Sequence, residues 1–243
     1  MKTFWYKSKN FGDNLTAILV RKILNEKIEL ADRNDKGKLL AVGSILTAMR
    51  ENDVIWGTGS IRDAEIKIPN GVKILALRGP LTRRILRGEN IPQIYGDPGL
   101  LLPLIYNPKI KKIHKIGIVP HYVDKEIRIE NGMHFINIES EPKKIIQEIL
   151  SCELIISSSL HGIVCAEAYG IPAIWAKYSN KIIGGDFKFQ DYFLGTGRGI
   201  QKKNVIIEPI KNLAWRQGRL IGALELMILD IKKVLKLVIC IIC

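Results

Sequence analysis

The chain has 243 residues, of which 47% are hydrophobic, and its charges are dispersed among long apolar runs; this excludes a disordered protein and leaves room for one large domain or two of ordinary size. The formal net charge of +13 predicts an anionic partner. Because the basic residues are spread along the chain, with no known DNA- or RNA-binding motif, we expect a small anion or an anionic membrane surface and no nucleic acid.

In the first half of the chain, short β-branched runs alternate with helical patterns, which is typical of parallel α/β sheets. The expected strands are Thr3–Tyr6, Leu39–Val42, Val54–Trp56, Lys73–Leu77 and Ile94–Tyr95. Helices are expected over Gly12–Leu24, which repeats apolar residues on one face, and over Leu81–Leu86, which follows a proline.

The pattern restarts after the charged segment Tyr106–Lys115, which we interpret as a linker. The expected strands beyond it are Ile116–Val119, Phe135–Ile138, Leu154–Ser157, Ala173–Ala176 and Val205–Ile207. The expected helices are Pro142–Leu150, Ile163–Tyr169 and a long one from about Ile210. Gly184–Gly199 is predicted to be a glycine-rich loop, either an ordinary mobile loop or one that closes over a sugar with Asp186, Lys188 and Gln190.

Two successive alternating halves predict an α/β protein with two Rossmann-like parallel-sheet domains, residues 1–108 and 109–243. The last residues, Leu235–Cys243, are unusually apolar; we expect a helix packed across both domains, with peripheral contact at the inner face of the cytoplasmic membrane as the alternative. The first ten residues lack the apolar core of a signal peptide and the cysteines show no paired metal spacing, so we expect a cytoplasmic protein without a metal site.

The segment Ser157–Gly162, SSSLHG, carries the strongest candidate site. A buried strand delivers three serines and a histidine into the turn that begins a helix, where unpaired backbone amides and the helix dipole attract an anion. The anion would contact Ser159, Leu160 and Gly162, and His161 could give up a proton or hold a phosphate. The alternative is that His161 caps the helix and the serines satisfy backbone groups.

Arg78 is a second candidate, because it is the first charged residue after the buried strand Lys73–Leu77. A guanidinium at the end of a strand offers a planar fork to a carboxylate or a phosphate. The alternative is a surface salt bridge.

Other polar residues follow strands as well. Asp13 could cap a helix or bind a hydroxyl. His121 lies at the carboxyl end of a strand and is a candidate for contact with a substrate. Asp97 most simply makes a tight turn with its own backbone. The remaining candidates for substrate contact are small or polar residues in two strand-end loops: Gly12, Asn14, Gly59 and Ser60. No GxGxxG pattern is present, so a dinucleotide site is not supported.

Taken together, the segments NFGDN, WGTGS, LRGP, YGDP, VPH, SSSLHG, AEAYGIPAIW and GDFKFQDYF resemble, in their order and spacing, the polysaccharide pyruvyl transferase family. The resemblance implies a GT-B-like arrangement of the two domains with the site in the cleft between them. It also implies an enzyme that transfers the enolpyruvyl group of phosphoenolpyruvate onto two hydroxyls of a sugar or a lipid-linked oligosaccharide of a bacterial surface or exported polysaccharide. The products are a pyruvate ketal and phosphate, and no cofactor is needed.

By the same resemblance, Arg78 and His161 would lie at phosphoenolpyruvate, and His121 or Asp13 near the acceptor sugar. The chain is short for the family, so elements are expected to be missing around Leu30–Leu40. Two rival functions stay open: a glycosyltransferase of the same architecture that uses a nucleotide sugar, for which Glu167 is a weak candidate ribose ligand, and a non-catalytic module that binds sugars or anions.

Overall fold

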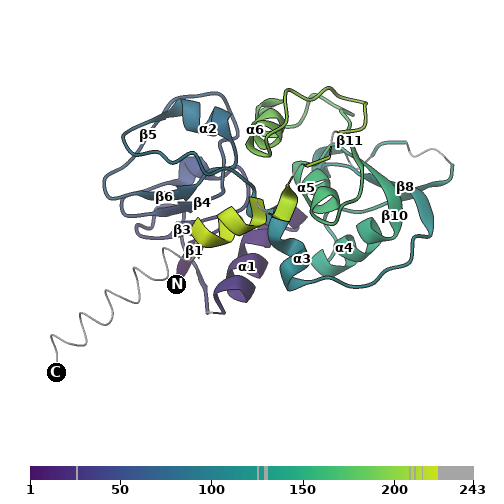
Figure 1. Cartoon of the computed structure of the whole chain (residues 1–243), viewed down its shortest axis with the longest axis horizontal. Coiled ribbons are helices and arrows are strands. Elements are labelled where there is room, and N and C mark those ends of the chain that lie inside the picture. The colour runs from purple at the N-terminus through teal and green to yellow at the C-terminus, as the bar shows by residue number, and fades with distance from the viewer. Residues whose placement is uncertain are drawn as a thin grey trace.

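The computed structural model describes residues 1–25, 27–124, 126–128, 131–207, 209–210, 212–214 and 216–223. These residues form a mixed α/β structure whose two main sheets lie side by side (Figure 1). Every strand pairing inside the two sheets is parallel. The expected α/β class with parallel sheets is therefore confirmed.

The first sheet has five strands in the order β2-β1-β3-β4-β6. The strands are β1 (Lys2–Phe4), β2 (Glu29–Leu30), β3 (Leu39–Leu40), β4 (Val54–Trp56) and β6 (Lys73–Ala76). Two helices, α1 (Phe11–Leu24) and α2 (Pro80–Ile85), follow β1 and β6. A separate pair joins β5 (Ile66–Lys67) to β7 (Leu86–Arg87).

The second sheet has four strands in the order β11-β10-β8-β9. The strands are β8 (His114–Val119), β9 (Met133–Phe135), β10 (Cys152–Ser157) and β11 (Ala173–Trp175). Its helices are α4 (Pro142–Leu150) and α5 (Leu160–Ala168). Short helical turns complete the path: η1 (Leu46–Ala48), η2 (Pro98–Leu101), α3 (Leu102–Ile105) and η3 (Tyr122–Asp124).

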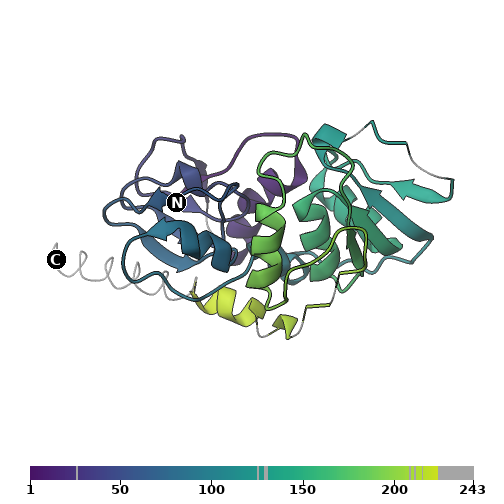
Figure 2. The same ribbon diagram turned by 90° about the horizontal axis from the view of Figure 1, so that it is seen from above.

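Two helices join the halves. Helix α1 contacts both α4 and α5 of the second half, and one cluster of buried apolar side chains takes members from both halves, among them Phe11 and Ile163. Helix α6 (Phe187–Gly195) lies between the halves, where it contacts α2 and where Phe189 and Phe193 pack on Trp175 (Figures 1 and 2). The two sheets are therefore held as neighbours by shared packing.

The last described residues return to the first sheet. Residues 216–223 are helical, and Trp56 Nε1 donates a hydrogen bond to the carbonyl of Leu220 at 2.8 Å. Within the described residues, no helix combines the length and the apolarity that crossing a membrane requires. The apolar segment Leu235–Cys243, expected to be a packed or membrane-lying helix, lies outside the described residues.

Several expected elements need correction. The predicted glycine-rich loop over Gly184–Gly199 contains α6, because Phe189, Tyr192 and Phe193 repeat at helical spacing between the glycines. The strands expected at residues 94–95 and 205–207 are reduced to single bridges, at Tyr95 and Ile206. Strands β2, β5 and β7 have two residues each, which is too short to show a strand period in the sequence.

Candidate functional site

A cavity of 430 Å³ opens among the loops that follow strands of both sheets. Its walls come from the segments after β1, β3, β8 and β10 and from the start of α6, so the carboxyl ends of the two sheets converge on it. The polar lining includes Ser8, Asp13, Ser44, His121, Ser159, His161 and Lys188. The predicted residues Asp13, His121, Ser159, Leu160 and His161 are thus brought together.

The N-terminus of α5 forms the floor of this site. Ser159 is its N-cap residue, yet the Ser159 side chain makes no capping hydrogen bond, so it leaves the first amides of the helix free of the usual cap. Ser157 Oγ instead donates to the Val119 carbonyl at 2.7 Å, and Ser158 Oγ donates to Asp124 Oδ2 at 2.8 Å. Two of the three serines therefore hold the loop in place, and the helix end beside Ser159 keeps its capacity for an anion.

His161 lies in the first turn of α5 and is mostly buried, with 12% of its side chain exposed. One face of its ring packs on Gly12, where an added Cβ would lie 2.1 Å from Nδ1. The opposite nitrogen, Nε2, lies 3.5 Å from Oδ2 of the fully buried Asp97. Gly12 is therefore required for the ring to fit, a role different from the direct substrate contact that the sequence suggested.

Two opposite charges share the cavity with His161. Asp13 accepts a hydrogen bond from Ser8 Oγ at 2.6 Å, but burial is the larger influence and raises the pKa of the Asp13 carboxyl. Lys188, only 8% exposed, has its pKa lowered to about 8, mainly by burial and further by the charge of Arg78. Within the described part of the chain, the Lys188 ammonium forms no ion pair. It is thus available to an anionic ligand.

His121 lines the same cavity with a neutral ring. Burial and the nearby Lys188 lower the pKa of His121 to about 4, so its imidazole is neutral at pH 7. Its Nδ1 accepts a hydrogen bond from the Val123 amide at 3.4 Å, and its backbone amide donates to Ser158 Oγ at 2.9 Å. A neutral imidazole can exchange hydrogen bonds with a sugar hydroxyl but cannot serve as a cationic acid.

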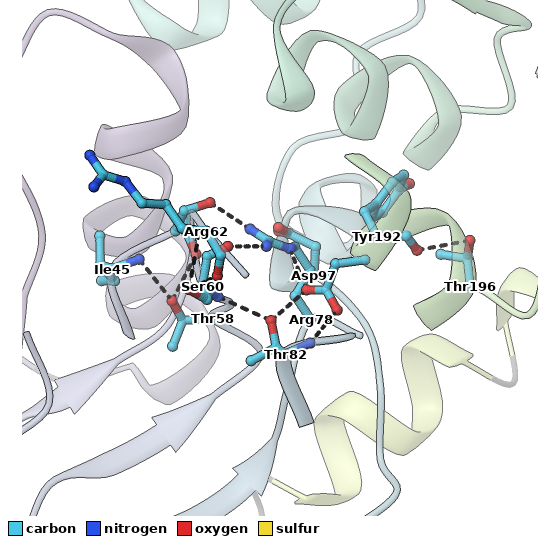
Figure 3. A network of polar contacts seen from close by, with 12 residues as sticks. Ile45, Thr58, Ser60, Arg62, Arg78, Thr82, Asp97, Tyr192 and Thr196 are labelled. Atoms are coloured by element: carbon cyan, nitrogen blue, oxygen red, sulfur yellow. Dashed lines mark hydrogen bonds and ion pairs between the residues drawn. The ribbon is translucent and has the colours of Figure 1, made fainter. Parts of the chain in front are cut away.

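Arg78 is fully buried and does not line the cavity. It belongs to the network of polar contacts drawn in Figure 3. Its Nε donates to Asp191 Oδ2 of α6 at 3.0 Å, and its Nη1 and Nη2 donate to Ser44 Oγ and the Ser60 carbonyl, each at 2.6 Å. The Asp191 carboxylate also accepts a hydrogen bond from the Thr82 amide at 2.8 Å, so a residue of α6 caps the start of α2. The exposed salt bridge considered as an alternative for Arg78 is therefore wrong, because both partners are fully buried.

Replacing Arg78 with Met should lower the free energy of unfolding by about 3–5 kcal/mol, because the Asp191 carboxylate would stay buried without its counter-charge. The control is Arg84→Met, which breaks an exposed pair with Asp63 and should cost at most about 1 kcal/mol. Urea unfolding of both variants measures the difference. A loss of equal size in the two proteins would contradict the structural role of Arg78.

The other predicted contacts lie outside the lining of the cavity. Gly59 lets the Arg78 guanidinium approach, since an added Cβ would lie 2.5 Å from it. Ser60 accepts Arg78 through its carbonyl, and Asn14 donates to the Ser8 carbonyl at 2.9 Å. Gly162 faces Ser157 Oγ, which an added Cβ would approach to 2.4 Å. None of these four residues lines the cavity, and each contacts a side chain or loop that does or that lies next to it.

Two residues of this region, Asp97 and Asp191, were not identified as site residues from the sequence, and Lys188 was named only as part of a loop that could close over a sugar. Lys188 and Asp191 belong to α6, whose helical spacing of aromatic residues was the available signal. Asp97 makes the expected turn, with Oδ1 accepting a hydrogen bond from the Gly99 amide at 2.9 Å, and its second oxygen faces His161.

Glu167, the candidate ribose ligand of the rival glycosyltransferase hypothesis, is bound to Tyr192 at 2.6 Å and to Arg198, so its carboxylate is already satisfied. Within the residues the structure describes, no group of three or more His, Cys, Asp or Glu side chains is arranged to hold a metal ion.

Comparison with known proteins gives a consistent result. The family model described as "Polysaccharide pyruvyl transferase" matches residues 10–180. An uncharacterised protein of Acanthamoeba polyphaga mimivirus is 31% identical over 209 residues, covering 78% of this chain and 71% of that protein. The succinoglycan biosynthesis protein ExoV of Rhizobium meliloti is 26% identical over 206 residues, covering 79% of this chain and 64% of that protein. No solved structure matches the chain.

Proposed function

The chain belongs to the polysaccharide pyruvyl transferase family, and on that basis we propose that it transfers the enolpyruvyl group of phosphoenolpyruvate onto sugar hydroxyls of a polysaccharide precursor, with release of phosphate. In this proposal, residues 1–108 and 109–243 form two GT-B-like domains, and the 430 Å³ cavity is the reaction site in the cleft between them. The ExoV protein, named for succinoglycan biosynthesis, supports a saccharide acceptor.

One observation carries the proposal: the cavity combines the N-terminus of α5, whose N-cap side chain makes no capping bond, with a nearly buried ammonium that forms no direct ion pair within the described residues. Phosphoenolpyruvate has two anionic groups, a phosphate and a carboxylate. The amides at the start of α5 suit the phosphate, and Lys188 suits the carboxylate. Arg78, expected at the donor, acts from behind this site, where it holds Ser44 and keeps Lys188 and α6 in place.

The chemistry can be divided among the remaining residues. His161 gives a proton to the methylene carbon of the donor, and the first sugar hydroxyl attacks the neighbouring carbon, forming one C–O bond. The second hydroxyl forms another C–O bond as the bond to phosphate breaks, and phosphate leaves with the second proton. Asp13, whose pKa is raised by burial, accepts the proton of the first hydroxyl. His121, being neutral, orients the acceptor by hydrogen bonding.

The test is an incubation of purified protein with phosphoenolpyruvate and lipid-linked or free envelope saccharides, followed by measurement of phosphate and of acid-labile ketal pyruvate. We expect phosphate and ketal in equal amounts, and only when both substrates are present. Turnover of a nucleotide sugar without phosphate release from phosphoenolpyruvate would overturn the proposal in favour of a glycosyltransferase. Saccharide binding without turnover of either donor would overturn it in favour of a non-catalytic module.

A further inference from the structure

Two buried polar atoms face each other behind the cavity. Among the residues that the structure describes, Asp97 Oδ2 and His161 Nε2 are both buried without a hydrogen-bond partner, and they lie 3.5 Å apart. Leaving one such atom unpaired costs about 1–3 kcal/mol, so a pair of them side by side is rare in a folded protein. A shift of a few tenths of an ångström would join them in a charge-assisted hydrogen bond.

The surroundings hold Asp97 in this position. Its Oδ1 accepts the Gly99 amide at 2.9 Å, at the start of η2, which fixes the carboxylate plane. The adjacent Pro98 is held by Gly57 of the WGTGS loop, where an added Cβ would lie 2.4 Å from the proline ring. Among the described residues, no lysine or arginine pairs with Asp97. His161 is therefore the side chain with which Asp97 Oδ2 can form a hydrogen bond.

The placement of His161 makes such a partner necessary. The ring lies in the first turn of α5, at the positive end of the helix dipole, where a negatively charged neighbour is favoured. Lys188 adds a second positive charge to the same cavity. The Asp97 carboxylate, 3.5 Å from Nε2, supplies this negative charge and can accept the Nε2 proton.

We propose that Asp97 is a positioning residue for the proposed pyruvyl transfer: it accepts the Nε2 proton of His161, fixes the ring in the Nε2–H tautomer and leaves Nδ1 as the nitrogen that exchanges a proton with the donor. This inference rests on the proposed function for its kinetic part. The tautomer it assigns is a property of the resting protein and stands apart from turnover. The arrangement links the YGDP and SSSLHG segments, which are distant in the sequence.

The test is Asp97→Asn. Asparagine keeps the carbonyl that accepts the Gly99 amide, but it would present an NH₂ group to His161 and so favour the Nδ1–H tautomer. We expect kcat to fall at least about 100-fold, the size of a lost general-acid contribution, with the affinity for phosphoenolpyruvate within about threefold of wild type. The matched control is Asp32→Asn, because Asp32 makes the same turn bond to the Asn34 amide at 3.1 Å and does not line the cavity.

The second measurement needs no substrate. ¹⁵N chemical shifts of the ring nitrogens, assigned by comparison with His161→Gln, report the tautomer of His161 directly. We expect Nε2–H in the wild type and Nδ1–H in Asp97→Asn. Wild-type protein in the Nδ1–H form, or an Asp97→Asn variant with unchanged tautomer and kcat, would overturn the inference. Absence of pyruvyl transfer in the wild type would instead overturn the proposed function, and the ¹⁵N result would still decide the role of Asp97.

Discussion

Replacing His161 with Gln should lower kcat about 10²–10⁴-fold, because the site would lose the group that protonates the methylene carbon. The affinity for phosphoenolpyruvate should change little, since the amides at the start of α5 and the Lys188 ammonium remain. Glutamine is close in size to histidine, so the space beside Gly12 stays filled. Turnover is measured by phosphate release, and donor affinity by calorimetry with phosphoenolpyruvate alone.

The matched control for this variant is His134→Gln. His134 stacks on His114 at the β8–β9 pairing, with ring centroids 4.0 Å apart, and neither ring lines the cavity. We expect His134→Gln to keep wild-type kcat. A His161→Gln protein that folds, binds the donor and turns over within threefold of wild type would rule out His161 as the proton donor.

The parts of the fold that could be predicted are those with a strong local signal. The bounds of β4 and α4 agree with the predicted Val54–Trp56 and Pro142–Leu150, because each is an apolar pattern with clear boundaries. α6 was missed because the glycines that flank it are the usual signal of a loop, which outweighed the helical spacing of its aromatic residues. The packing of Phe189 and Phe193 on Trp175 stabilises the helix.

The candidate site likewise combines residues whose positions could be predicted from the sequence with residues whose positions could not. The position of His161, Asp13 and His121 at strand ends could be predicted, because parallel strands bring their carboxyl ends to one edge. The buried position of Arg78 could not be predicted, because its partner Asp191 is far along the chain and only the packing of α6 on α2 brings the two together. The same packing places Lys188 in the cavity. The segment GDFKFQDYF contains both residues, but a sequence pattern does not show which of its side chains face a cavity or a buried partner.

Lys188→Met should weaken phosphoenolpyruvate binding about 10- to 100-fold, the usual effect of losing a hydrogen bond to a charged group. Lys188 is nearly buried and faces the cavity without a direct ion pair among the described residues, so its ammonium can bond to an anion there. The loss should appear in donor affinity and in KM for phosphoenolpyruvate, with a smaller effect on kcat. Lys177→Met, in the exposed segment after β11, is the control and should leave affinity unchanged.

The dependence on pH separates this role of Lys188 from simple packing. The pKa of Lys188 is lowered to about 8, mainly by burial, so the ammonium is charged below pH 8 and loses its proton above it. Wild-type affinity for phosphoenolpyruvate should therefore be highest below pH 8 and fall up to about tenfold for each pH unit above it. Lys188→Arg keeps a permanent charge and should bind equally well at pH 7 and pH 9.5. If wild type and Lys188→Arg showed the same pH dependence, the charge of Lys188 would have no part in holding the donor, and the anion would be held by the start of α5 alone.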